Sequence, residues 1–253
     1  MPIDVKFPSG PVLVTGAARG LGAAIAVALA ESGIEPLMLG RSSLSLDNVR
    51  ARVEPIFGRQ SRTIVADVSD WHSLRSSIAE SLAPGEMLRG VVNNAGVIDP
   101  IDRVSDGDPE EWLRCIQVNL CGAYLVLRAS LAHLPPGGVI ANISSGAAAA
   151  EHAGWSAYAA SKAGLERLSA TLAGERPDLV VHAVRPGITD TEMQTRIKDS
   201  KIDNAVRKIP KEAMQPVEVP AAAIARLFVR RFPTITDRVV EASVFRASPA
   251  VQE

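Results

Sequence analysis

Tyr158 and Lys162 are the two side chains whose types and spacing point most directly to chemistry. They stand four residues apart in a segment with helical periodicity from about Trp155 to Ala173, so a helix would place both on one face. A neighbouring ammonium stabilises a phenolate and lowers the pKa of a tyrosine, which would then exchange a proton near neutral pH. The pair predicts an acid/base unit, and the alternative is an ordinary pair on a helix surface.

A glycine-rich turn follows the first apolar segment of the chain. Gly16, Gly20 and Gly22 lie between the run Val12–Thr15 and an alanine-rich segment of helical length. Glycines let the backbone approach a phosphate closely, and the start of a helix favours negative charge. The turn is typical of a dinucleotide pyrophosphate site, although similar turns also arise for packing reasons.

The residues after the second apolar run bear on the choice of dinucleotide. Gly40 and Arg41 stand where an acid would accept hydrogen bonds from a free ribose 2′-hydroxyl. A guanidinium instead suits a 2′-phosphate. We therefore expect NADP(H) to be preferred over NAD(H), with Arg19 as a second positive charge. The alternative is that Arg41 is a solvated surface arginine.

The chain alternates short apolar runs with amphipathic segments, which is the pattern of parallel βαβ units. No linker or internal repeat divides it. We predict an α/β fold, a single Rossmann-type doubly wound parallel sheet of about seven strands with helices on both faces, in one domain over residues 1–253. The expected strands are Val12–Thr15, Pro36–Leu39, Thr63–Ala66, Gly90–Asn93, Gly138–Ile143 and Leu179–Val184, and helices are expected to begin near Gly20, Leu46, Asp70, Pro109, Trp155 and Val217.

The segment Thr189 to Pro216 departs from this pattern because it is polar and weakly periodic. We expect a mobile substrate loop that covers the site, and the alternative is a simple connector.

Composition excludes several classes of partner and site. Lys+Arg 27 against Asp+Glu 28 leaves a net charge of -1, so no basic field would hold a nucleic acid. Cys115 and Cys121 are too few for a disulfide framework and lack metal-ligand spacing, so we expect two buried thiols and no metal. There is no stretch of eighteen apolar residues and no targeting segment. We expect a cytoplasmic protein that neither spans nor binds a membrane.

Taken together and in order, the motifs identify a resemblance to the short-chain dehydrogenase/reductase family over nearly the whole chain. The ordered set comprises Thr15–Gly22, Asp67, Asn93-Asn94-Ala95-Gly96, Asn119, Ser145, Tyr158, Lys162 and Pro186-Gly187. The resemblance implies that Asp67 meets the adenine, that Asn94 braces the central sheet, and that Thr191 meets the carboxamide or phosphate side of the cofactor. The implied cofactor-binding residues are Gly16, Arg19, Gly20, Leu21, Gly22, Arg41, Asp67, Val68, Asn94, Ala95, Gly96, Tyr158, Lys162, Pro186, Gly187, Thr189 and Thr191.

The resemblance also implies a catalytic set. Ser145 would hydrogen-bond the substrate carbonyl, with Ser144 as the less favoured register, and Asn119 would hold a water that relays protons to Lys162. Lys162 would also bind the nicotinamide ribose. Tyr158 would exchange the proton that accompanies hydride transfer.

Two short segments, 154–158 and 190–194, resemble the sepiapterin reductase and benzil reductase branch. Glu241 stands near the position where sepiapterin reductases carry a pterin-binding acid, so the resemblance implies that it approaches substrate. The alternative is a surface carboxylate at a strand end. Asp99, Trp155 and Met193 are candidates for the walls of the substrate pocket, although Trp155 could equally pack inward as core.

The expected activity is NADP(H)-dependent reduction of a ketone or α-dicarbonyl, or the reverse oxidation of the alcohol. The competing hypothesis is a non-catalytic NADP(H)-binding redox sensor or scaffold. The expected partners are a small carbonyl or alcohol substrate and further copies of the chain, in a homodimer or homotetramer built through the helices Asp108–His133 and Trp155–Ala173.

Overall fold

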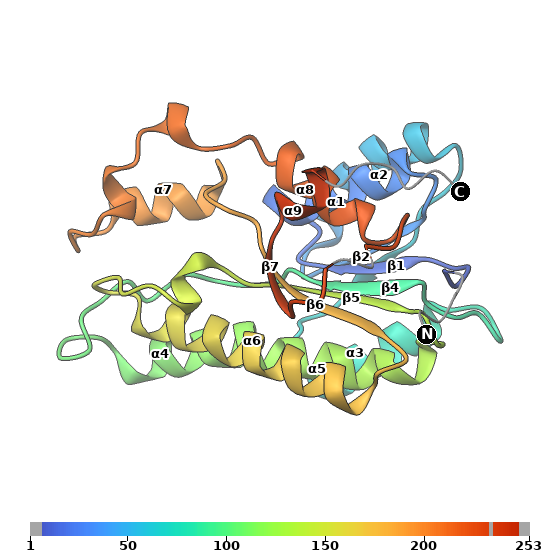
Figure 1. Cartoon of the computed structure of the whole chain (residues 1–253), viewed down its shortest axis with the longest axis horizontal. Helices are drawn as coiled ribbons and strands as arrows, with labels where there is room; N and C mark the ends of the chain where they lie inside the picture. The colour runs from blue at the N-terminus through green and yellow to red at the C-terminus, as the bar shows by residue number, and fades with distance from the viewer. Residues whose placement is uncertain (1–6, 233–234, 248–253) are drawn as a thin grey trace.

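Seven parallel strands form one sheet in the computed structural model, which describes residues 7–232 and 235–247 (Figure 1). The strand order is β3-β2-β1-β4-β5-β6-β7. The prediction of a doubly wound parallel sheet is confirmed, and most strand bounds agree within one residue. The strands are β1 (Val12–Thr15), β2 (Pro36–Gly40), β3 (Thr63–Val65), β4 (Gly90–Asn93), β5 (Val139–Ile143), β6 (Val180–Arg185) and β7 (Val239–Glu241).

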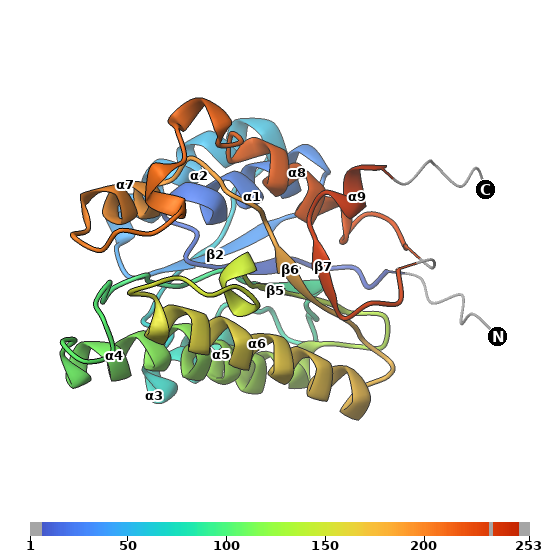
Figure 2. The same cartoon turned by 60° about the vertical axis from the view of Figure 1, so that its left-hand side comes forward.

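Helices cover both faces of the sheet, which explains why β1, β4 and β5 are buried along their whole length. One face packs against α1 (Gly20–Glu31), α2 (Ser43–Phe57), α8 (Glu218–Arg226) and α9 (Val244–Ala247). The other packs against α3 (Trp71–Glu80), α5 (Gly122–Ser130) and α6 (Ser156–Glu175). Figure 2 shows the two helical layers on either side of the sheet, with α7 (Glu192–Asp199) beyond its end.

Short polar side chains fix where several helices begin. Ser42 accepts a hydrogen bond from the Ser45 amide, so α2 starts slightly earlier than the sequence predicted. Asp70 caps α3 in the same way. Asp108 caps α4 (Pro109–Ile116), where the following proline suits the first helical turn.

One long helical run covers the sheet beside α6. It consists of α4, the π-helical turn η1 (Gln117–Cys121), α5 and the 3₁₀ turn η2 (Leu131–His133). The run Pro109–His133 is long and apolar enough to cross a membrane by length and composition alone. The same character suits a helix that covers a sheet, and Val126 and Leu127 are buried against the core. Cys115 is buried as expected, but Cys121 is partly exposed because it lies on the outward face, three residues before the exposed Tyr124.

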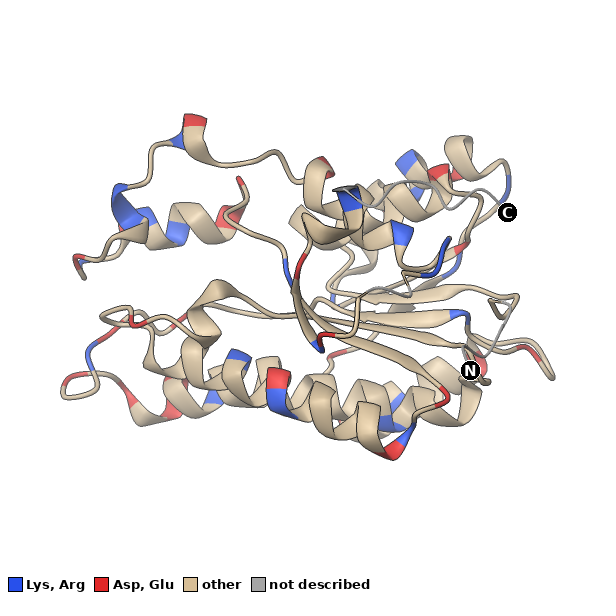
Figure 3. Ribbon diagram, in the orientation of Figure 1, with Lys and Arg blue, Asp and Glu red and all other residues tan. Residues whose placement is uncertain are grey.

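The strand order reverses at the boundary between β1 and β4, which places the residues after these two strands side by side. In doubly wound sheets this is the position where ligands bind. The segments that follow β1, β4, β5 and β6 all emerge at this edge. Positively and negatively charged residues are interspersed along the ribbon of both layers (Figure 3).

Candidate active site at the carboxyl ends of the strands

Asn94 and Thr15 join the ends of β4 and β1. The Thr15 hydroxyl accepts hydrogen bonds from the amides of Asn94 (3.0 Å) and Ala95 (3.1 Å). In return, the Asn94 side-chain amide donates to the carbonyls of Thr15 (3.1 Å) and Gly16 (3.3 Å). The bracing role implied for Asn94 therefore corresponds to four hydrogen bonds that hold the glycine turn against the neighbouring strand.

The glycine turn has no room for side chains at two positions. A Cβ atom at Gly22 would lie 2.3 Å from the Gly16 carbonyl oxygen, and one at Gly16 would lie 2.9 Å from the Ala95 Cα. Gly16 also has a φ of 63°, which L side chains rarely adopt. The turn thus brings bare backbone to the start of α1, where Gly20 and Leu21 open the helix. Free amides at this position suit a phosphate.

Both arginines proposed for the cofactor phosphates have acidic partners. Arg19, directly before α1, pairs with Glu192 at the start of α7. Arg41 lies 3.8 Å from Asp67, and its side chain is 62% exposed. Burial raises the pKa of Asp67, but hydrogen bonds from Ser69 and the charge of Arg41 outweigh it, so the net pKa is lowered. Asp67 is therefore an ionised acceptor beside the Arg41 guanidinium.

The remaining cofactor candidates after β3 and β4 lie beneath this turn. Val68 is buried against the long helical run, where a Cβ at Gly122 would approach it to 2.8 Å. Gly96 lies beside the catalytic candidates, since a Cβ there would be 3.2 Å from the Asn119 side-chain oxygen and 3.6 Å from the Lys162 Nζ atom. The structure thus brings the β4 loop next to Lys162.

Tyr158 and Lys162 lie on the inner face of α6, against the end of β5. Lys162 is 4% exposed, its Nζ atom donates to the Ile143 carbonyl at 2.7 Å, and it lies 5.7 Å from the centre of the Tyr158 ring. Ser145 follows β5 and caps the 3₁₀ turn η3 (Gly146–Ala148), where its hydroxyl accepts from the Ala147 amide. The helix and the strand end therefore bring three of the four catalytic candidates together.

Burial dominates the electrostatics of this pair. It raises the pKa of Tyr158 to about 12, and a hydrogen bond with Ser145 offsets only part of the shift. Burial also lowers the pKa of Lys162 to about 8. The expectation that Lys162 lowers the pKa of Tyr158 is wrong for this structure, because both groups lose water and desolvation favours the neutral forms. At neutral pH Tyr158 keeps its proton, which is the form that can donate.

Asn119 lies in the π-helical turn, buried behind Lys162. Its side-chain oxygen accepts from the Val97 amide (2.8 Å), and its nitrogen donates to the Val97 carbonyl (2.8 Å) and the Ser161 hydroxyl (3.0 Å). Single π-helical turns often occur at functional sites. Because the side chain already holds the β4 loop, a water relay at Asn119 would have to use its main-chain carbonyl.

The segment after β6 returns to the glycine turn. The Pro186 carbonyl accepts from the Gln215 side chain at 2.6 Å, and the Thr189 hydroxyl donates to the Gly187 carbonyl at 3.2 Å. Thr191 precedes α7 and approaches the start of α1, since a Cβ at Gly20 would lie 3.8 Å from its methyl group. The segment after β6 is therefore a neighbour of the glycine turn.

The candidates for the substrate wall form an apolar cluster with α7. Trp155 is 5% exposed, meets the Tyr158 ring edge-on at 5.8 Å, and packs in the cluster to which Met193 of α7 also contributes. Its indole nitrogen is buried and has no hydrogen-bond partner among the described residues. Asp99 binds Arg196 of α7 at 2.7 Å. The wall candidates thus tie α7 to the β4 loop, and Trp155 packs inward.

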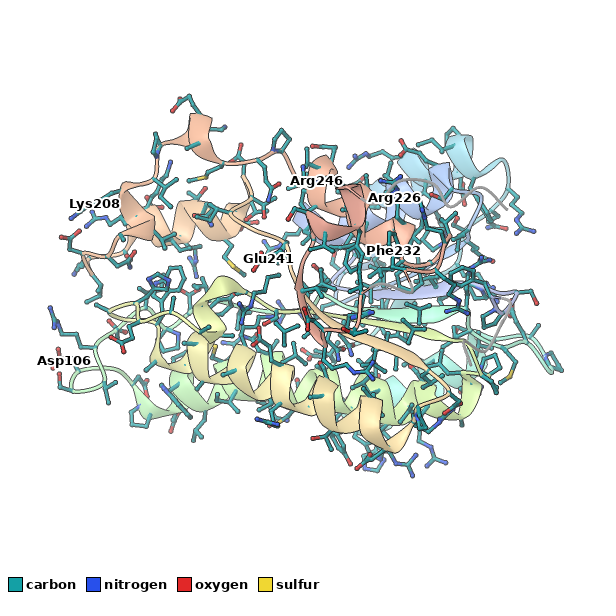
Figure 4. All side chains as sticks on the ribbon, viewed as in Figure 1. Asp106, Lys208, Arg226, Phe232, Glu241 and Arg246 are labelled. Carbon is teal, nitrogen blue, oxygen red and sulfur yellow. The ribbon has the colours of Figure 1, made fainter. Side chains whose placement is uncertain are left out.

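Glu241 lies apart from the catalytic candidates, although it shares a cavity with the cofactor candidates Pro186 and Gly187. It ends β7 opposite Arg185, with 3.9 Å between their nearest charged atoms. Figure 4 shows it beneath Arg246 of α9, and both residues border a cavity of about 140 Å³. No catalytic candidate borders that cavity. The position agrees with the alternative of a carboxylate at a strand end.

The sequence reasoning missed a charged group next to the catalytic candidates. Glu166 accepts a hydrogen bond from the Ser144 hydroxyl and binds Arg185 through both carboxylate oxygens. The available signal was spacing, because Glu166 stands one helical turn after Lys162 and so continues the face that carries Tyr158.

The comparisons agree with this geometry. The model of the short chain dehydrogenase family matches residues 11–202. The benzil reductase ((S)-benzoin forming) of Bacillus subtilis is 33% identical over 195 residues, which cover 74% of this chain and 78% of that protein. The benzil reductase of Saccharomyces cerevisiae is 28% identical over 243 residues, covering 88% and 91%. The crystal structure of a yeast short chain dehydrogenase/reductase matches with a TM-score of 0.83 at 25% identity, covering 92% of this chain and 96% of that one.

Proposed function

The chain belongs to the short-chain dehydrogenase/reductase family, and on that premise we propose that it reduces a ketone or α-dicarbonyl with NADP(H). The observation that supports this most strongly is the contact set at the end of β5. Ser145, Tyr158 and Lys162 meet there, beside the glycine turn that follows β1. The cytoplasmic location and homo-oligomeric state expected from the sequence belong to the same proposal.

The residues around the glycine turn fit a dinucleotide. The turn offers backbone without side chains at the start of α1, and Asp67 offers an ionised carboxylate on the adenosine side. Arg41 and Arg19 would bind the 2′-phosphate that distinguishes NADP(H) from NAD(H). Bound there, NADPH would supply hydride to the carbonyl carbon.

Tyr158 acts as the general acid in this proposal. Ser145 and Tyr158 hydrogen-bond the substrate oxygen, and these contacts strengthen as negative charge grows on it. Tyr158 then gives its proton to the alkoxide. Lys162 supplies positive charge behind the tyrosine and binds the ribose. Ser145 rather than Ser144 takes the serine role, because the Ser144 hydroxyl already donates to Glu166 at 2.8 Å and the residue is 2% exposed.

The substrate class rests on the relatives. Two curated relatives are named benzil reductases, and benzil is an aromatic 1,2-diketone. The apolar cluster around Trp155 and Met193 suits an apolar carbonyl compound. The competing hypothesis, a non-catalytic NADP(H)-binding sensor or scaffold, does not require a serine, tyrosine and lysine in contact.

The test is NADPH consumption, followed by its absorbance, with benzil and a panel of diketones, pterins, quinones and keto esters. A sensor or scaffold would leave the absorbance unchanged with every compound. Tyr158→Phe deletes one hydroxyl and no ring packing, so it should bind NADPH normally and lose about a hundredfold to ten-thousandfold of turnover.

The matched control is Tyr124→Phe, because Tyr124 is the other tyrosine of the chain and lies half exposed on α5. It should keep full turnover. If Tyr158→Phe kept more than about a tenth of the rate, less than about 1.4 kcal/mol of barrier lowering would belong to its hydroxyl. The proposed acid would then be wrong.

A further inference from the structure

Three residues of α6 each interact with one of three consecutive residues at the end of β5. Ser145 lowers the pKa of the Tyr158 hydroxyl, and Lys162 donates to the Ile143 carbonyl at 2.7 Å. The third contact is made by Glu166, which accepts from the Ser144 hydroxyl at 2.8 Å. The α6 residues recur every four positions and so form one stripe along the helix. The first two contacts belong to the proposed catalytic set, whereas nothing assigns a role to the third.

Glu166 also connects the strand ends that flank the site. Arg185, at the end of β6, binds it with two parallel hydrogen bonds, Nε to Oε1 at 2.8 Å and Nη2 to Oε2 at 2.9 Å. The Glu166 and Arg185 side chains are 14% and 21% exposed. A bidentate pair of this kind fixes both direction and distance. Glu166 is therefore held in one orientation, with Oε1 shared between Arg185 and Ser144.

Ser144 is fixed from two sides as a result. Its amide donates to the Val184 carbonyl of β6 at 2.8 Å, and its hydroxyl is held by Glu166. Ser145 is the next residue in the chain. Its hydroxyl position therefore depends on the orientation of the Ser144 peptide, and a misplacement of about 1 Å at a reacting centre can cost about a hundredfold in rate.

We propose that Glu166 is a positioning residue, which through Ser144 sets the Ser145 hydroxyl against Tyr158 and aligns α6 with the end of β5. The proposal rests on the proposed carbonyl reduction for its effect on rate. Its geometric part stands independently, because the hydrogen bonds of Glu166 with Ser144 and Arg185 are formed without substrate.

Two variants separate the parts of this contact. Ser144→Ala removes the hydroxyl and leaves the Glu166–Arg185 pair intact. Glu166→Gln keeps the side-chain volume but replaces one carboxylate oxygen by an amide group. That group faces the Arg185 Nη2 atom in one orientation, and both the Arg185 Nε atom and the Ser144 hydroxyl in the other. Because Ser144→Ala deletes one atom from a buried serine, it remains informative if Glu166→Gln folds poorly.

The matched control is Glu35→Gln at the opposite end of the sheet. Glu35 binds Arg62 with the same geometry, Nε to Oε1 at 2.8 Å and Nη2 to Oε2 at 2.9 Å, and is also 14% exposed. Arg62 also binds Glu86 at 2.7 and 2.9 Å, so Glu35→Gln weakens a charge cluster away from the site rather than an isolated pair. A loss of kcat that reflects only weakened ion pairing should appear in this variant as well as in Glu166→Gln.

The first readout is kinetic, with benzil and NADPH. Ser144→Ala and Glu166→Gln should lower kcat about tenfold or more, while the Kd of NADPH from fluorescence titration stays within about twofold. The primary isotope effect with deuterated NADPH should rise, because hydride transfer becomes slower relative to the other steps.

The double variant should lose no more kcat than Glu166→Gln alone. Glu35→Gln should lower the urea midpoint and leave kcat unchanged.

The second readout does not need turnover. In a Tyr124→Phe background Tyr158 is the only tyrosine, so ¹³Cζ-labelled tyrosine gives one NMR resonance from its ring. That resonance should move in Ser144→Ala and Glu166→Gln and stay in place in Glu35→Gln.

The two readouts separate failure of this inference from failure of the proposed function. An unmoved resonance in both Ser144→Ala and Glu166→Gln would overturn the positioning role, whatever the rates. Equal kcat losses in Glu166→Gln and Glu35→Gln would also overturn it. If the resonance moves in the variants but the wild-type protein consumes NADPH with none of the carbonyl compounds tested, the positioning role is supported and carbonyl reduction is rejected.

Discussion

Replacing Lys162 by methionine should stabilise the folded protein at neutral pH while abolishing its proposed activity. The ammonium is 4% exposed, and burial lowers its pKa from 10.5 to about 8. Below about pH 8 the lysine is protonated in both folded and unfolded chains, so folding carries the full cost of burying the charge. The shift corresponds to about 3 kcal/mol, at about 1.4 kcal/mol per unit. Methionine has similar length and no charge, and therefore removes this cost.

The sign of the pH dependence separates this cost from other effects. Between pH 8 and 10.5 the unfolded chain binds more protons at this lysine than the folded one, so the wild type gains stability as the pH rises. Losing the hydrogen bond from Lys162 to the Ile143 carbonyl costs about 1–3 kcal/mol in the variant at every pH, and this part cancels in a comparison of two pH values. The advantage of Lys162→Met should therefore shrink by about 2 kcal/mol from about pH 7 to about pH 9.5.

Urea unfolding without cofactor measures this difference, since cofactor binding would add its own contribution. Lys208→Met is the control for removing a lysine, because the Lys208 side chain is 68% exposed. A stability difference for Lys162→Met that does not change between about pH 7 and about pH 9.5 would refute the assignment of a buried ammonium with a lowered pKa.

Three further predictions follow from the fold and the site. Arg41→Ala should weaken NADPH binding about tenfold to a hundredfold and leave NADH nearly unchanged, and an equal loss for both would reject a 2′-phosphate contact. Limited proteolysis should cut residues 189–216 more slowly with NADPH than without it, and equal rates would count against a cover that closes. Light scattering at micromolar concentration should show a dimer or tetramer, and Leu113→Glu, at an exposed leucine of α4, should shift it to monomer. A monomeric wild type would contradict that assembly.

The sequence determined the features that depend on neighbouring residues. The apolar runs located the first six strands because parallel strands covered on both faces must be apolar throughout. Polar caps such as Asp70 and Asp108 marked the helix starts. The spacing of Tyr158 and Lys162 fixed their shared face, because a helix repeats every 3.6 residues.

Only the tertiary structure decided what these residues meet. Arg19 pairs with Glu192, 173 positions away, and no local pattern carries that contact. The hydrogen bond from Ser144 to Glu166, 22 positions away, is likewise visible only in the fold. The pKa of Tyr158 was misjudged for the same reason. The lysine neighbour of Tyr158 is visible in the sequence. The burial that raises the pKa of Tyr158 is not, because β5, α6 and the surrounding loops produce it jointly.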